Sequence, residues 1–126
     1  LARHLPDYDA VMYANRTLPE GASVFLLFTG DRGYYWEREY YYGDRMGNFL
    51  IGFVKNASDG AALAKKFTSR GTTHLFLNDR LMEKFLNDNF DPAGLSVVAD
   101  FFNNHATRLY SSNGYTLFDL KQPTPR

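Results

Sequence analysis

The stretch that decides the fold is SVFLLFTGDRGYYWEREYYYGDR, which runs from Ser23 to Arg45. It opens with Val24–Phe28, an apolar run that no polar residue interrupts. A strand that is covered on both faces has such a run, whereas a half-exposed strand alternates apolar and polar residues. Parallel strands between two layers of helices are covered in this way. The stretch therefore predicts an α/β domain in which Val24–Phe28 is an inner strand.

Three predicted strands are followed by the same kinds of residue. The strands are Val24–Phe28, Glu39–Tyr42 and Thr73–Leu77, and each is followed, directly or after Thr29, by Gly or Asn, then Asp, then Arg. If the three strands are parallel, these endings collect at one edge of the sheet, which is where open α/β sheets bind their ligands. The residues of this candidate binding site are Asp31, Arg32, Asp44, Arg45, Asp79 and Arg80.

Two interpretations of these endings are open. Each Asp comes just before a predicted helix, where Asp is a preferred N-cap because its carboxylate accepts a hydrogen bond from an unpaired helix N–H. In that case the Arg that follows is simply solvated. Alternatively, Arg side chains beside helix N-termini suit a phosphate or a carboxylate group. Only the second interpretation gives the Arg side chains a partner.

Apolar periodicity and turn residues predict the other elements. Helices are predicted over Asp7–Leu18, Met46–Lys55, from Ser58-Asp59-Gly60 to just before Gly71, over Arg80–Asn89, and onward from Asp91-Pro92. Gly71 stands where a residue in the left-handed conformation ends a helix. The runs Thr107–Tyr110 and Tyr115–Leu120 are joined through Asn113-Gly114, a strong hairpin signal. We therefore expect one α/β domain with a mixed sheet, a parallel three-strand core, helices on both faces and a C-terminal antiparallel hairpin.

Two points of this fold have alternatives. Tyr34–Arg38 is read as a short helical turn that makes Glu39–Tyr42 parallel to the first strand, but the connection is short for a crossover and a hairpin competes with it. Met46–Lys55 is apolar over most of its circumference. It is read as a buried helix, with a surface insertion that contacts lipid or a partner domain as the alternative.

Composition excludes several classes of function. Lys+Arg and Asp+Glu number 14 each, so the chain lacks the excess of basic residues that nucleic-acid binding needs. The absence of Cys excludes thiolate metal sites and a Cys nucleophile, and His4, His74 and His105 are too scattered for a metal site. No catalytic constellation and no nucleotide fingerprint is present, so neither a cofactor nor a metal is expected. His74, at the start of a strand, is read as a packed or edge histidine.

The chain is expected to be part of a longer protein. It begins with Leu1 instead of Met, and it contains neither a signal-peptide pattern nor an apolar stretch long enough to span a membrane. One domain is expected over residues 1–126, with an ordered core from about residue 7 to about residue 120.

Two stretches resemble a known family. They are Thr17–Arg38, with TLPEGA before LLFTGDRGYYWER, and Ser69–Asn78, SRGTTHLFLN. Both are similar to the C-terminal soluble domain of multi-spanning membrane glycosyltransferases, the superfamily of the dolichyl-phosphate-mannose–protein mannosyltransferases and bacterial aminoarabinose transferases. The similarity extends over roughly Asp7–Leu120 as a pattern of strand and turn residues.

The resemblance implies a function for the domain. In that family the transfer of sugar from a polyprenyl-phosphate carrier depends on acidic residues in extracytoplasmic loops of the membrane part, which this chain lacks. It thus implies a non-catalytic accessory domain on the extracytoplasmic, periplasmic side. The implied partners are the transmembrane part of the same parent chain and the membrane surface. The alternative is a stand-alone α/β binding module for a small anionic ligand at the carboxyl edge of the strands.

Overall fold

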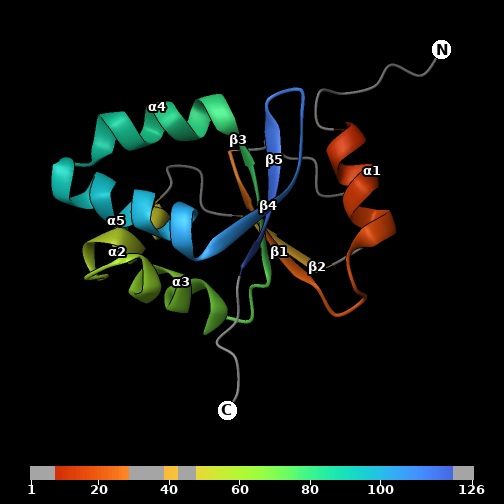
Figure 1. The fold of residues 1–126 in the computed structure, drawn as a ribbon, viewed down its shortest axis with the longest axis horizontal. Helices are drawn as coiled ribbons and strands as arrows, with labels where there is room; N and C mark the ends of the chain where they lie inside the picture. Colours follow the sequence, from red (N-terminus) through yellow and green to blue (C-terminus); the bar gives the residue numbers. More distant parts are fainter. Residues whose placement is uncertain (1–7, 29–38, 43–47, 121–126) are drawn as a thin grey trace.

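A computed structural model describes residues 8–28, 39–42 and 48–120 of the chain. These residues form one α/β unit, in which helices and strands follow each other singly or in pairs along the chain (Figure 1). In chain order, the elements are α1 (Tyr8–Thr17), β1 (Ser23–Leu27), β2 (Glu39–Tyr42), α2 (Asn48–Lys55), α3 (Gly60–Thr68), β3 (His74–Asn78), α4 (Asp79–Asn89), α5 (Pro92–Asn104), β4 (Ala106–Ser112) and β5 (Tyr115–Leu120).

The strands form one mixed sheet in the order β2-β1-β3-β5-β4. β1 pairs in parallel with β2 and with β3, so the parallel sense that was preferred for Glu39–Tyr42 is the one found. β5 pairs antiparallel with both β3 and β4. The α/β class, the mixed sheet and the C-terminal antiparallel hairpin are therefore confirmed.

The predicted parallel three-strand core needs a correction. The central strand of the sheet is β3, and it has one parallel neighbour, β1, and one antiparallel neighbour, β5. β2, which was expected to belong to the core, is at one end of the described sheet. The centre is mixed because β5 returns through a tight turn and pairs with β3 over five residue pairs, from His74↔Asp119 to Asn78↔Tyr115.

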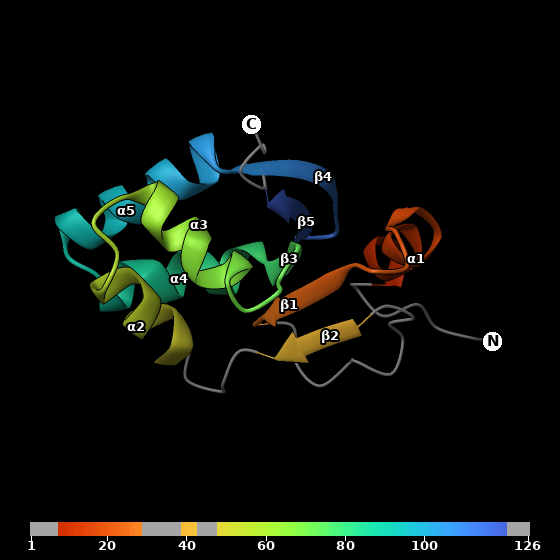
Figure 2. The same cartoon turned by 90° about the horizontal axis from the view of Figure 1, so that it is seen from below.

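Helices cover both faces of the sheet, as Figures 1 and 2 show. Among the described helices, α1 covers one face, and α2, α3, α4 and α5 form the layer on the other. Every residue of β1 is buried, because Val24 and Leu26 face the α1 side while Phe25 and Leu27 face the four-helix side. The apolar run of β1 is therefore continuous because both faces of the strand are covered, as was expected.

The predicted helix over Met46–Lys55 corresponds to α2. Leu50 and Val54 are buried in the core on the four-helix side, and Phe53 packs edge-on against Phe67 of α3. These contacts favour the buried-helix interpretation over a surface insertion. The predicted turn at Tyr34–Arg38 lies outside the described residues.

Local signals in the sequence act as expected at three helix ends. Asp59 and Asp91 are the N-caps of α3 and α5, where their carboxylates accept hydrogen bonds from Ala62 N–H and Gly94 N–H. Gly71 has φ +88°, and the bonds Thr72 N–H to Phe67 C=O and Gly71 N–H to Thr68 C=O close α3 in the Schellman pattern.

The hairpin of β4 and β5 contains one irregularity. Its turn residues Asn113 and Gly114 both have positive φ, 55° and 85°, as a tight two-residue turn requires. In β4 the register shifts between Arg108 and Tyr110, so Leu109 is an extra residue without a cross-strand partner. Such a bulge bends the strand and increases its twist.

Candidate functional site

The carboxyl ends of the parallel strands lie at one edge of the sheet. Leu26 of β1 is in register with Tyr42 of β2, and Leu27 is in register with Leu77 of β3. The segments that leave β1 and β2, residues 29–38 and 43–47, therefore start at the edge where α4 begins. Four of the six candidate residues, Asp31, Arg32, Asp44 and Arg45, lie outside the described residues. Asp79 and Arg80 are in the first turn of α4.

Asp79 does not cap α4. The N-cap is Asn78, whose backbone is extended and whose side-chain oxygen accepts a hydrogen bond of 3.1 Å from Leu81 N–H. Asp79 is the first helical residue. The capping interpretation is therefore wrong for Asp79, because the preceding Asn is an equally good cap and stands one residue closer to the strand.

The carboxylate of Asp79 instead binds the C-terminal hairpin. Its two oxygens lie 2.7 and 2.9 Å from the hydroxyl of Thr116 in β5, which donates to them. The backbone N–H of Asp79 donates to the carbonyl of Gly114 at 2.8 Å. Thr116 is buried, and its hydroxyl is also 3.2 Å from the hydroxyl of Ser111 in β4. Asp79 thus joins the start of α4 to β5 and to the hairpin turn.

Arg80 has a different environment. Its side chain is exposed, and within residues 8–28, 39–42 and 48–120 it makes no hydrogen bond or ion pair. Leu81, the next residue, is 45% exposed, although large apolar side chains of this domain are mostly buried. The first turn of α4 therefore presents a cation and an apolar side chain to solvent, beside a carboxylate that is already engaged.

A strained residue stands at the same edge. Phe28, directly after β1, has φ +60°, a conformation that bulky residues rarely adopt and that costs of the order of 1–3 kcal/mol. Its half-buried ring packs against Phe85 of α4 with the ring centroids 5.1 Å apart. This contact joins Phe28, at the end of β1, to α4. Sequence reasoning missed Phe28, because an aromatic residue is no signal for positive φ.

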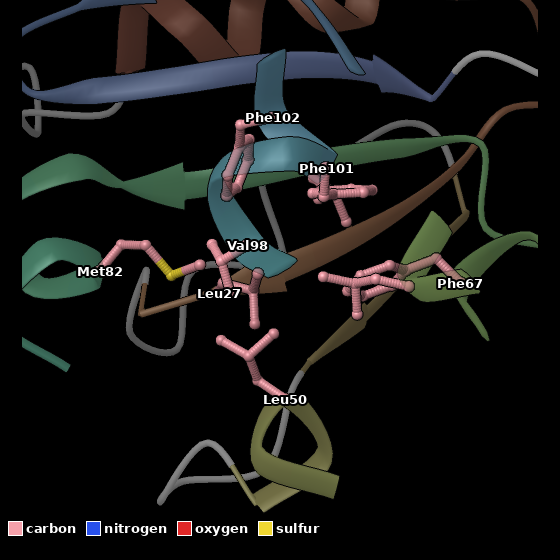
Figure 3. A pocket seen from close by; sticks show the side chains of 9 residues that line it. Leu27, Leu50, Phe67, Met82, Val98, Phe101 and Phe102 are labelled. Carbon is pink, nitrogen blue, oxygen red and sulfur yellow. The ribbon is translucent and has the colours of Figure 1, made fainter. Parts of the chain in front are cut away.

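One gap between the sheet and the four-helix layer is lined by apolar side chains. Nine side chains from the sheet and the four-helix layer line this gap, which has no room for a water molecule (Figure 3). They are Leu27, Leu50, Leu63, Phe67, Leu75, Met82, Val98, Phe101 and Phe102. A ligand pocket combines open volume with a few placed polar groups, so this gap is part of the core packing and not a binding site.

The described residues offer neither a metal site nor a membrane span. In the described part of the chain, no group of three or more His, Asp or Glu side chains is placed to hold a metal ion. None of the described helices has the length and apolar character to cross a membrane.

The two described candidate residues are expected to differ in their effect on stability. Asp79→Ala removes the acceptor of the buried Thr116 hydroxyl and is expected to lower the free energy of unfolding by about 1 kcal/mol. Arg80→Ala, one residue on, is the matched control and is expected to stay within about 0.5 kcal/mol of wild type. Urea denaturation measures both values. An equal loss for the two variants would contradict the assigned role of Asp79.

The comparisons with known proteins bear on the fold. No protein-family model matches the chain, and no curated protein matches its sequence. The fold is similar to a solved structure, the C-terminal globular domain of an oligosaccharyltransferase from Archaeoglobus fulgidus, with a TM-score of 0.63 and 10% sequence identity. The match covers 96% of this chain and 100% of that chain. At this identity the likeness is one of fold, and it does not show the mannosyltransferase and aminoarabinose transferase superfamily that was expected from the sequence. The chain thus has the α/β fold of an oligosaccharyltransferase C-terminal globular domain.

Proposed function

We propose that this chain is a non-catalytic accessory domain of a membrane glycosyltransferase that takes its sugar from a polyprenyl-phosphate carrier. The observation that carries the proposal is the fold likeness, which extends over nearly the whole of this chain and the whole of the oligosaccharyltransferase domain. The sequence resemblance to soluble domains of membrane glycosyltransferases supports the same broad class on separate grounds, since it rests on the strand and turn residues of Thr17–Arg38 and Ser69–Asn78.

The finer points of the proposal come from the resemblance. The parent enzyme would belong to the mannosyltransferase and aminoarabinose transferase superfamily, with its catalytic acids in loops of the membrane part. The domain would lie on the extracytoplasmic side and pack on that membrane part. No residue of this chain is proposed to take part in sugar transfer.

The carboxyl edge of the strands is the proposed contact surface within this arrangement. It holds Arg80 exposed and without a partner among the described residues, next to the exposed Leu81. Asp79 does not compete for that cation, because its carboxylate is bound to Thr116. Asp31, Arg32, Asp44 and Arg45 remain proposed members of the same surface, on the segments that leave β1 and β2 at this edge.

A transfer assay tests the function. The purified 126-residue chain is expected to form no glycosylated product from a polyprenyl-phosphate-linked sugar and an acceptor, because the catalytic acids are proposed to lie in the membrane part. Membranes that contain the complete gene product are expected to form the product. The readout is incorporation of labelled sugar.

Two results would overturn the proposal. One is turnover by the purified chain itself. The other is a complete gene product that has no membrane-spanning part, which would instead favour the stand-alone binding module.

A further inference from the structure

His74 occupies a buried position at the amino end of the central strand. It is the first residue of β3 and is 6% exposed. In register, it stands between Val24 of β1 and Asp119 of β5. This is the end of the sheet opposite to the candidate site, so the role of His74 is a separate question. The expectation of a packed histidine is confirmed.

Both ring nitrogens of His74 have polar neighbours. Nδ1 lies 2.7 Å from the hydroxyl oxygen of Thr73, and Nε2 lies 3.6 Å from a carboxylate oxygen of Asp119. The Asp119 side chain is 46% exposed, so one side of the pair reaches solvent. A buried imidazole with a hydroxyl on one nitrogen and a carboxylate near the other can exist in either charge state, but with different hydrogen bonds.

Thr73 connects this ring to the neighbouring strands. Its hydroxyl oxygen accepts from Ser23 N–H at 2.8 Å and lies 3.1 Å from the Ser23 carbonyl. Its backbone N–H donates to the Ser23 carbonyl, and its own carbonyl accepts from Leu120 N–H. Thr73 therefore holds β1, β3 and β5 together at their common end.

The hydroxyl proton of Thr73 has two possible acceptors, Nδ1 of His74 and the carbonyl oxygen of Ser23. When the ring is neutral with its proton on Nε2, Nδ1 is an acceptor, and the hydroxyl donates to it across the shorter distance of 2.7 Å. When the ring is protonated, Nδ1–H becomes a donor. The hydroxyl must then accept from Nδ1–H, and its proton can go only to the Ser23 carbonyl at 3.1 Å.

The surroundings of His74 decide which state the fold favours. Burial lowers the pKa of His74 from its usual 6.5, and the nearby Asp119 carboxylate offsets part of this effect. β1 presents Ser23 and Val24, which do not titrate in this range, and Thr107 of β4 pairs with Asp119. α1 packs on this face through buried apolar residues, namely Ala10, Val11 and Ala14. Asp119 is thus the charged group among the described residues that acts on the ring.

We propose that Thr73, His74 and Asp119 form a proton-responsive clamp at the amino end of β3. Uptake of one proton at Nδ1 turns the Thr73 hydroxyl from Nδ1 to the Ser23 carbonyl and gives the ring a positive charge beside the Asp119 carboxylate. The neutral clamp joins β1 and β3 through the ring and the hydroxyl. The protonated clamp places a buried cation between β1 and β5, and the fold tolerates it only because of Asp119.

The sign of the pH dependence follows from linkage. The folded-state pKa of His74 is lower than the unfolded value, so the unfolded chain binds more protons as the pH falls below about 6.5. The stabilisation that results from the lowered pKa of His74 is therefore fully present above about pH 6.5, and it is lost as the pH falls below that value. The melting temperature of the 126-residue chain is therefore expected to fall between pH 7.5 and pH 5 by more in wild type than in His74→Phe, which has no proton to take up.

Two matched variants sharpen the test. Asp119→Asn keeps the size of the side chain and removes its charge, so it is expected to lower the titration midpoint of His74 and to steepen the acid-induced fall. His105→Gln removes the other described histidine and is expected to leave the fall as in wild type.

The chemical shifts of the His74 ring nitrogens, measured by NMR, report the protonation of each nitrogen in wild type. This measurement does not depend on whether His74→Phe folds. Above the titration midpoint Nδ1 is expected to have the chemical shift of an acceptor nitrogen, and below it that of a donor. The proposal is overturned if the ring titrates at or above 6.5, if the neutral ring has its proton on Nδ1, or if Asp119→Asn leaves the midpoint unchanged.

Discussion

Replacement of Phe67 by alanine is expected to lower the free energy of unfolding by about 3–5 kcal/mol, the largest loss predicted for this domain. Phe67 lies on α3 and is 1% exposed. Its ring contacts Phe25 of β1 edge-on at 5.5 Å and Phe53 of α2 edge-on at 5.1 Å, and it lies 5.7 Å from Phe101 of α5. The variant therefore opens a cavity where four elements meet, and the close-packed surroundings can collapse into it only in part.

Urea denaturation with an exposed control measures this loss. Leu81→Ala changes a large apolar side chain that is 45% exposed, so it is expected to stay within about 0.5 kcal/mol of wild type. If Phe67→Ala cost no more than Leu81→Ala, the packing described for the four-helix layer would be incorrect.

Gly60→Ala is the second large effect, with an expected loss of about 3 kcal/mol, because the new methyl group overpacks a contact between backbones. A Cβ at Gly60 would lie 2.5 Å from the backbone nitrogen of Phe101 and 2.7 Å from the carbonyl carbon of Asp100. These are backbone atoms of α5 and cannot move aside as a flexible side chain can. The same approach allows Gly60 N–H to donate to the Asp100 carboxylate at 2.7 Å. A methyl group would thus push the start of α3 away from α5.

Gly52→Ala is the matched control for this prediction. Gly52 lies inside α2, and a Cβ there would have no neighbour within 4 Å. Alanine is favoured over glycine in a helix interior by roughly 0.5–1 kcal/mol, so this variant is expected to be more stable than wild type. Thermal or urea unfolding is then expected to show a loss of stability for Gly60→Ala and a gain for Gly52→Ala. The same sign for both would contradict the close approach of α3 and α5.

The parts of the fold that were predicted correctly depend on local chemistry. The unbroken apolar run Val24–Phe28 predicts that this strand is buried on both faces, since a half-exposed strand alternates apolar and polar residues. Asn113-Gly114 forms its turn because both residues tolerate positive φ, and Gly71 ends α3 for the same reason. The centre of the sheet was harder to predict. β3 and β5 are far apart in the sequence, and an apolar run does not show whether its neighbour is parallel or antiparallel.

The candidate site shows the same division. The sequence places Asp79 and Arg80 at the start of α4, at the edge where the parallel strands end. It does not show that Asn78 takes the capping position, because both residues are good caps. The bond from Asp79 to Thr116 follows from the pairing of β5 with β3 and has no local signal at all. Phe28 is a similar case, since neither its positive φ nor its contact with Phe85 of α4 has a signal in the neighbouring sequence.

The bulge at Leu109 affects how this domain behaves beside other copies of itself. β4 is at one end of the sheet, so its outer backbone groups could serve as a template for strand addition by a second molecule. Edge-to-edge growth needs a flat strand with a regular alternation of N–H and C=O groups. The extra residue breaks that alternation midway along the strand, and the added twist turns the two halves out of a common plane. We therefore expect the bulge at Leu109 to make this edge a poor template for strand addition, although it leaves a large apolar side chain partly exposed to water.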